Sequence, residues 1–220
     1  MKWRYASGLS SNEVAVVTIG EDRKTLKDMT DKDRIAILSP ACTQHVLLCM
    51  LAREQLGDAH GLDNQLVSMS HPDSVNALLS GTEITAHVST PPYISQELKG
   101  GARVLATGED IMGEPFTFIA GVAMEEFYEN HREYYDAFIE ALEESVDYIN
   151  ENRQDAVRLL APVYGITEEE LEEQMGYNGT IYSTGLKGVP RFSAAMYEMG
   201  FISEDRPVEE LVFGNVNYYQ

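Results

Sequence analysis

The segment from Ser68 to Tyr93 constrains the fold of this chain more than any other part of the sequence. An apolar strand ends near Met69, and the polar turn at His71–Asp73 then caps a helix predicted from about Ser74 to Leu79. Gly81 ends that helix, Ile84–Val88 forms the next strand, and Pro91-Pro92 cannot continue it. Strand, helix and strand at this spacing predict a βαβ unit with parallel strands.

Polar residues follow both strands of this predicted unit. Ligands of open α/β sheets bind outside the carboxyl ends of parallel strands, so these residues are candidates for contact with a small polar ligand. They are Met69, His71 and Asp73 after the first strand, and Ser89, Thr90, Pro91 and Tyr93 after the second.

The preceding segments repeat the same strand–helix order. Ser39 is predicted to cap a helix that has Pro40 in its first turn, runs to about Gln55 and ends at Gly57. Its first free N–H groups could hold an oxyanion or a carbonyl, which adds Ser39, Ala41, Cys42, Thr43 and Gln44 to the candidate ligand contacts. The other elements expected in this half are strands at Glu13–Ile19, Ile35–Leu38, Gln65–Met69, Arg103–Ala106 and Phe116–Ala123, a short helix at Lys24–Met29 and a loop at Glu109–Glu114.

After Met124 the apolar spacing changes to that of helices. One amphipathic helix is predicted from Phe127 to Ile149, with the aromatic row Phe127, Tyr134 and Phe138 in the core. Later elements are a helix at Arg153–Tyr164, a capping box at Thr167–Glu170, a turn at Tyr177–Thr180 and a helix at Ser193–Met199.

The charge of the chain limits its partners. A formal net charge of −20 opposes binding to nucleic acid and to anionic membrane surfaces. The segment Gly121–Thr180 alone holds 16 acidic and 3 basic residues, which is typical of solvated helix faces. No apolar run is long enough to span a membrane, and Met1–Leu9 lacks the apolar core of a signal peptide.

The pattern Pro72-Asp-x-x-x-Ala-Leu-Leu-Ser-Gly81, followed by Ala86-His-x-Ser-x-Pro-Pro-Tyr93, resembles the NMT1/SsuA-like substrate-binding proteins of ABC importers. Trp3–Leu9, Lys27–Ala36 and Arg191–Ile202 resemble segments of that group in the same order. The resemblance implies a periplasmic-binding-protein type 2 fold: an α/β lobe with a parallel-rich mixed sheet, followed by a C-terminal helical portion. We expect residues 1–12 to be the remnant of a first lobe, 13–123 the ligand-binding lobe and 124–220 the helical portion.

The resemblance also implies a function. Such a protein captures a small polar or heteroaromatic nutrient of the sulfonate, taurine, nitrate or thiamine-pyrimidine class and delivers it to ABC permease subunits, without catalysis. Its lobes would close about hinge strands near Val14–Thr18 and Phe116–Ala120. The location implied is periplasmic, or extracellular and membrane-anchored. The signal and first half-lobe of the group are expected to be absent here, which would leave an apolar surface open to self-association.

Two chemical alternatives remain open in the sequence. Cys42, His45 and Cys49 share a predicted helix face and could be metal ligands or core residues; core packing is favoured, because the helix is apolar nearly all round. His87 lies inside a predicted strand and is either a buried histidine or a ligand contact.

The alternative function is that of a pyrimidine-synthase-like enzyme or of a ligand-sensing module. The sequence has no nucleophile–base pair, metal set or cofactor motif of a known enzyme class. We therefore expect no cofactor and no metal.

Overall fold

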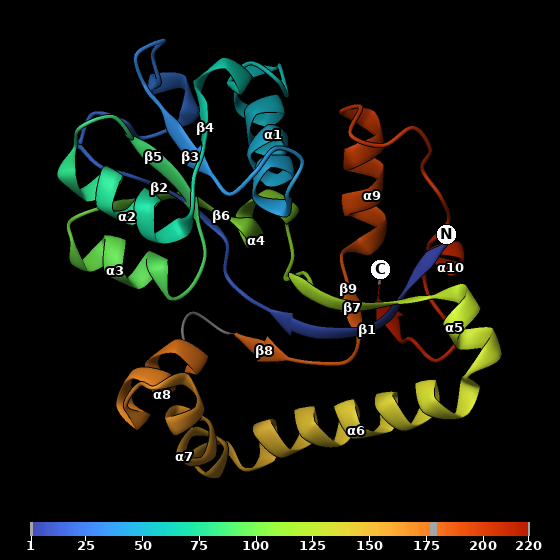
Figure 1. Ribbon diagram of the computed structural model, residues 1–220. Helices are drawn as coiled ribbons and strands as arrows, with labels where there is room; N and C mark the ends of the chain where they lie inside the picture. Colours follow the sequence, from blue (N-terminus) through green and yellow to red (C-terminus); the bar gives the residue numbers. More distant parts are fainter. Residues whose placement is uncertain (1, 177–179, 220) are drawn as a thin grey trace. The chain divides into compact units, whose positions relative to one another are not determined.

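The computed structural model describes residues 2–176 and 180–219 (Figure 1). The chain forms two compact units: unit 1 is Met1–Asn12, Pro115–Ser193 and Glu204–Gln220, and unit 2 is Glu13–Glu114 with Ala194–Ser203. The sequence pattern predicts the second boundary at 123, whereas the segment of unit 2 ends at Glu114. The difference arises because β7 (Ile119–Met124) pairs antiparallel with β1 (Trp3–Ser11), so this strand belongs with the N-terminal residues.

Unit 2 is built on a five-stranded sheet. Its strands lie in the order β4 (Leu66–Ser68), β3 (Ile35–Ile37), β5 (Ala86–Ser89), β2 (Ala15–Thr18) and β6 (Arg103–Thr107). β3 runs parallel to β4 and β5, whereas β2 runs antiparallel to β5 and β6. This confirms the predicted mixed sheet, although two of its pairings are parallel and two antiparallel, so it is not parallel-rich. Strands β2, β3 and β5 are buried along their whole length.

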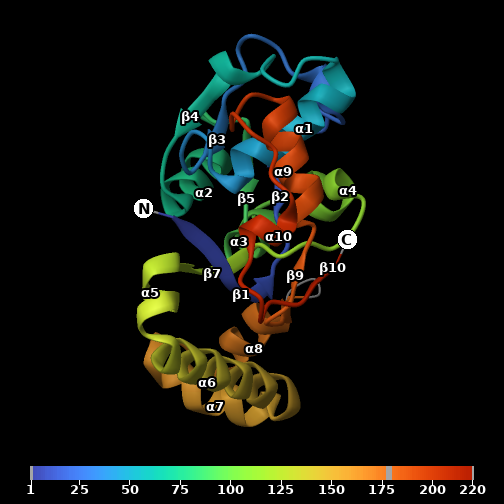
Figure 2. The same ribbon diagram turned by 90° about the vertical axis from the view of Figure 1, so that its right-hand side faces the viewer.

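Helices cover both faces of this sheet (Figure 1, Figure 2). α1 (Thr43–Leu56) lies on one face, while α2 (His71–Ser80) and α3 (Tyr93–Lys99) lie on the other. Residues 44–52 of α1 are all buried, as its apolar sequence predicts. The shorter elements are η1 (Leu26–Asp28), η2 (Asp63–Gln65) and α4 (Gly108–Met112).

Three local predictions for unit 2 are wrong, and one helix was not predicted. α1 begins at Thr43 because Ala41 takes a left-handed φ of 59°, so Ser39 and Pro40 precede the helix and do not cap it. α2 begins at His71, and Ser70 rather than Asp73 is its cap. Residues 108–112 form a helix instead of a loop, because Thr107 and Asp110 make a capping box. The helix that was not predicted is α3, which follows directly after Pro92.

Unit 1 combines small sheets with helices. β1 pairs with β7 on one side and with β8 (Ile181–Tyr182) on the other, and β9 (Leu186–Lys187) runs parallel to β10 (Tyr218–Tyr219). Its helical elements are α5 (Glu125–Asn130), α6 (Arg132–Glu151), α7 (Arg153–Tyr164), α8 (Glu168–Gly176) and α10 (Val208–Leu211). α9 spans Val189–Glu198 and is longer than predicted. The turn predicted at Tyr177–Thr180 falls mostly outside the described residues.

The long amphipathic helix of the sequence analysis is interrupted. His131, with φ −136° and ψ 45°, separates α5 from α6. The predicted aromatic core row is also wrong: Phe127, Tyr134 and Phe138 are 38%, 65% and 61% exposed. The buried face of α6 instead carries Tyr135 and Ile139, which pack with Ala6 and Phe213. No helix in the described part of the chain has the length and apolar content needed to cross a membrane.

Candidate functional site

Three loops meet at one edge of the unit 2 sheet. They connect β3 to α1, β4 to α2 and β5 to α3, and each leaves the carboxyl end of a parallel strand. The candidate ligand residues lie in these loops or in the first turn of the helix that follows, except Ser89, which is the last residue of β5. The edge thus has the geometry in which open α/β sheets bind ligands.

The loop before α1 ends in an uncapped helix. Cys42 is the N-cap residue, but its side chain makes no capping hydrogen bond, and the first turn contains no acidic residue. The first N–H groups of a helix have no partner within the helix and carry partial positive charge. Thr43 is half-buried, and Gln44 is buried beside these groups, whereas Ser39 and Ala41 are exposed.

In the loop before α2, some polar groups form local hydrogen bonds and others face the polar edge of the sheet. The backbone N–H of Met69 donates to the carbonyl of Ile37 at 3.0 Å, which extends the β3–β4 pairing. The carboxylate of Asp73 accepts a 2.5 Å hydrogen bond from the Ser70 hydroxyl and is exposed, so it is used by the capping of α2. His71, at the first position of the helix, is half-buried.

The loop before α3 contains buried hydroxyls. Ser89 and Thr90 are buried, while Pro91 and Tyr93 are half-buried. The Thr90 carbonyl accepts the backbone N–H of Tyr93 at 2.9 Å and so forms the turn into α3. The Ser89 hydroxyl is fully buried and has no hydrogen-bond partner among the described residues. A buried polar atom without a partner costs free energy, which makes the Ser89 hydroxyl a candidate contact for a water molecule or a ligand atom.

A row of hydrogen-bonded side chains runs from α3 through β5 and the first turn of α2 to the first turn of α1. Nδ1 of His87 lies 2.5 Å from Oε1 of Glu97, and Nε2 of His87 lies 2.9 Å from Nδ1 of His71. Nε2 of His71 lies 3.4 Å from the amide nitrogen of Gln44, and the Tyr93 ring stacks on the His71 imidazole at 5.1 Å. Burial, and next the positive charge that His87 can carry, lower the pKa of His71, which favours its neutral form.

The structure therefore brings His71, Gln44 and Tyr93 into one cluster, with His87 behind them. Glu97 was missed by the sequence analysis. It lies in the unanticipated helix α3, and no local pattern shows that a glutamate ten residues after His87 will be buried against it.

A second cluster in unit 2 contains possible metal ligands. His45, Cys49 and Asp63 place one ligand atom each within 4.8 Å of one another. Nδ1 of His45, however, accepts the backbone N–H of Ala41 at 3.0 Å, so in a neutral ring the proton lies on Nε2, facing Asp63. Burial raises the pKa of the Cys49 thiol to about 12, which favours its protonated form when no metal is bound. This arrangement suits hydrogen bonding better than metal binding, because a metal ligand needs a free lone pair or a thiolate.

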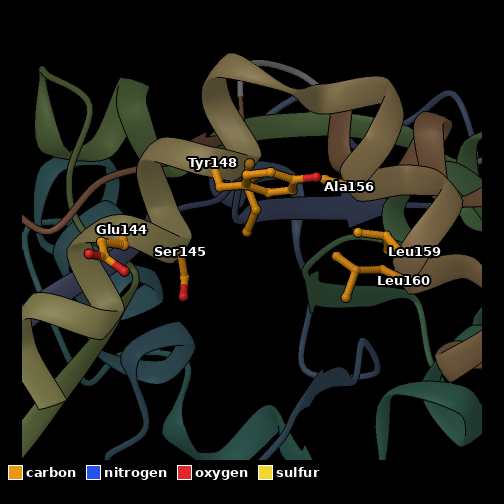
Figure 3. A pocket seen from close by; sticks show the side chains of 7 residues that line it. Glu144, Ser145, Tyr148, Ala156, Leu159 and Leu160 are labelled. Carbon is orange, nitrogen blue, oxygen red and sulfur yellow. The ribbon is translucent and has the colours of Figure 1, made fainter.

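Unit 1 has a pocket of its own between α6 and α7 (Figure 3). Its volume is about 500 Å³, and its lining is mostly apolar. Two of its hydroxyls are already engaged: Ser145 donates to the Ala141 carbonyl at 2.7 Å, and Tyr148 donates to the Asp155 carboxylate. The pocket therefore offers little to a small polar solute. Its lining residues are Glu144, Ser145, Tyr148, Ile149, Ala156, Leu159 and Leu160.

Comparisons with known proteins bear on the fold. No protein-family model matches the sequence, and the curated proteins contain no significant match to it. Among solved structures, the periplasmic aliphatic sulphonate binding protein SsuA from Escherichia coli is 17% identical, with a TM-score of 0.69 over 99% of this chain and 71% of that chain. The ligand binding component of an ABC-type import system from Staphylococcus aureus, solved with zinc bound, is 18% identical, with a TM-score of 0.72 over 96% of this chain and 72% of that chain.

An enzyme shares the architecture as well. The desulfurization enzyme DSZB is 12% identical, with a TM-score of 0.65 over 97% of this chain and 77% of that chain. At these identities the structures establish architecture and not activity. The structural relatives match the SsuA-like resemblance seen in the sequence, and this chain has the periplasmic-binding-protein fold.

Proposed function

We propose that this protein is the substrate-binding component of an ABC importer and captures a small solute that presents a hydrogen-bond acceptor. One observation carries the proposal: several hydrogen-bond donors and a buried hydroxyl without a partner lie together at one edge of the unit 2 sheet. The uncapped first turn of α1, the side chains of Gln44 and His71, and Ser89 supply these groups. Oxyanions and carbonyl oxygens are the groups that such donors bind.

Relatives with this fold support a transport role. SsuA from Escherichia coli is described as a sulphonate binding protein, and the Staphylococcus aureus relative as part of an import system. A sulfonate, taurine, nitrate or a pyrimidine would each present acceptor atoms to the edge. In this proposal the protein works outside the cytoplasm, closes its lobes about the predicted hinge strands and delivers the solute to the permease subunits.

The experiment is a thermal-shift screen of the purified protein against ethanesulfonate, taurine, nitrate and an aminopyrimidine, followed by calorimetry. A Tm that rises with ligand concentration, a saturable binding isotherm in calorimetry and recovery of the compound unchanged together support capture without catalysis. No stabilisation by any of these compounds counts against the proposal.

An enzyme is the second candidate, because DSZB has the same architecture and the edge holds a buried histidine–carboxylate pair. General-base catalysis would need a nucleophile or an activated water beside His71. Mass spectrometry of the recovered compounds separates the two candidates, since a catalyst converts its ligand and a carrier does not.

A further inference from the structure

The row of Glu97, His87 and His71 has a hydrogen-bond direction that follows from its burial. Glu97 and His87 are 0% exposed, and they come from α3 and β5, whereas His71 comes from α2 and is half-buried. The second carboxylate oxygen of Glu97 is also buried and has no partner among the described residues. An unpaired carboxylate in such a place is strongly disfavoured, so the Glu97–His87 pair is expected to carry no net charge.

A neutral pair can hold its shared proton on either partner. If Glu97 is ionised, His87 is an imidazolium with protons on both nitrogens. If Glu97 holds the proton and donates it to Nδ1, the neutral ring of His87 carries its own proton on Nε2. In both cases Nε2 of His87 carries a proton and donates it. Nδ1 of His71 lies 2.9 Å from this nitrogen and must therefore accept the hydrogen bond.

This direction fixes the tautomer of His71. A neutral imidazole whose Nδ1 accepts a hydrogen bond carries its proton on Nε2. The titratable groups on this side of His71 are His87 and, behind it, Glu97, while the ring of Tyr93 stacks on its face. Nε2 faces the Gln44 amide in the first turn of α1, and that amide can rotate to present its oxygen or its nitrogen.

We propose that His71 is a specificity-determining residue that donates its Nε2 proton to an acceptor atom of the solute, and that His87 and Glu97 are positioning residues that fix this tautomer. The inference rests on the proposed function and sharpens its ligand class. Oxyanions and carbonyl-bearing solutes are accepted, and solutes that present only donors, such as alkylammonium ions, are rejected. The side chain that contacts the solute is a neutral imidazole donor.

The tautomer can be measured without any ligand. Two-bond ¹H–¹⁵N correlation spectra of the whole protein at neutral pH distinguish a protonated from an unprotonated ring nitrogen, and the His71→Asn variant identifies the His71 signals. The expected result is a protonated Nε2 and an unprotonated Nδ1. A protonated Nδ1 with a bare Nε2 overturns the inference.

Ligand specificity is measured by calorimetry with ethanesulfonate, nitrate and ethylammonium. His71→Asn keeps an amide near the position of Nδ1 and loses the outward donor, whereas His71→Gln places an amide near the position of Nε2. Oxyanion affinity should fall about tenfold or more in His71→Asn and be largely restored in His71→Gln. His131→Asn, an exposed histidine of unit 1, should bind like the wild type.

The outcomes separate the two proposals. If an oxyanion binds and both His71 variants retain wild-type affinity, the role of His71 is wrong and the binding function stands. Preferential binding of ethylammonium also contradicts the role of His71. If neither oxyanion binds and the wider screen gives no ligand, the proposed function fails and the inference fails with it.

Discussion

Nδ1 of His87 and Oε1 of Glu97 lie 2.5 Å apart, and neither side chain is exposed to solvent. This pair connects the central strand β5 to α3 and, through His71, reaches the polar edge where three strand–helix loops meet. These hydrogen bonds tie the geometry of the edge to the packing of the core.

Thr43→Ala and Ser89→Ala should weaken ligand binding more than they destabilise the fold. The Ser89 hydroxyl has no partner among the described residues, so its removal leaves no newly unsatisfied group in the free protein. Loss of one hydrogen bond to a neutral ligand atom costs about 0.5–1.5 kcal/mol, and more to a charged atom. Calorimetry with the best ligand of the screen, together with urea unfolding, checks both parts. Variants that unfold more easily but bind normally would remove these residues from the site.

Two neighbouring residues of α6 should respond to truncation with very different losses of stability. Ile139 is 7% exposed in a core cluster, so Ile139→Ala should lower the free energy of unfolding by about 2–5 kcal/mol. Phe138 is 61% exposed, so Phe138→Ala should change it by no more than about 0.5 kcal/mol. Urea denaturation of both variants measures the difference. A larger loss for Phe138→Ala would restore the aromatic core row that the sequence suggested.

His60 should make the stability of unit 2 depend on pH. The Met199 carbonyl accepts from its Nε2 at 2.8 Å and Asp63 lies 2.9 Å from its Nδ1; these contacts raise the pKa of His60. A raised folded-state pKa contributes stability that is complete below the unfolded value of about 6.5 and is lost as pH rises through the folded value. The side chain is 46% exposed, so the effect should be small.

The measurement is the difference in Tm between about pH 6 and pH 8.5 for wild type and for His60→Gln. The wild type should lose more stability over this interval than the variant. Equal losses in the two proteins would show that His60 does not hold the segment Ala194–Ser203, which contributes the Met199 carbonyl.

Self-association of the chain should increase with salt. Trp3, Ile119 and Val122, on the paired strands β1 and β7, are 54%, 42% and 53% exposed, and exposed apolar groups favour association. The net charge of −20 makes copies of the chain repel one another. Salt weakens this repulsion, because at 0.1 M ionic strength charges more than about 10 Å apart are largely screened. Light scattering across a salt series tests the balance. A monomer at both low and high salt would contradict it.

The sequence predicted the parts of the fold that depend on local periodicity. The strands at β2, β3, β4 and β6, the βαβ order and the stops at Gly57, Gly81 and Gly165 follow from apolar runs and left-handed glycines. The start of α1 could not be predicted, because a left-handed alanine at position 41 has no sequence signature. The burial of Tyr135 instead of Tyr134 depends on the break at His131 and on contacts with Phe213, which is distant in the sequence.

The candidate site was only partly accessible from the sequence. Strand order places the three loops together, so His71, Gln44 and Tyr93 could be expected at one edge. Glu97 could not, because its role depends on a tertiary contact of α3 with β5. The folded geometry also decides which hydroxyls form hydrogen bonds. Ser70 uses its hydroxyl in the capping of α2, whereas the Ser89 hydroxyl has no partner among the described residues.

The most direct test is a crystal structure of the protein with ethanesulfonate, or with nitrate if it binds more tightly. We expect the oxyanion at the carboxyl edge of unit 2, with an oxygen within hydrogen-bond distance of Nε2 of His71 and of the first N–H groups of α1. Density in the α6–α7 pocket beside Tyr148 and Leu159, with the edge empty, would contradict the assignment of the binding site.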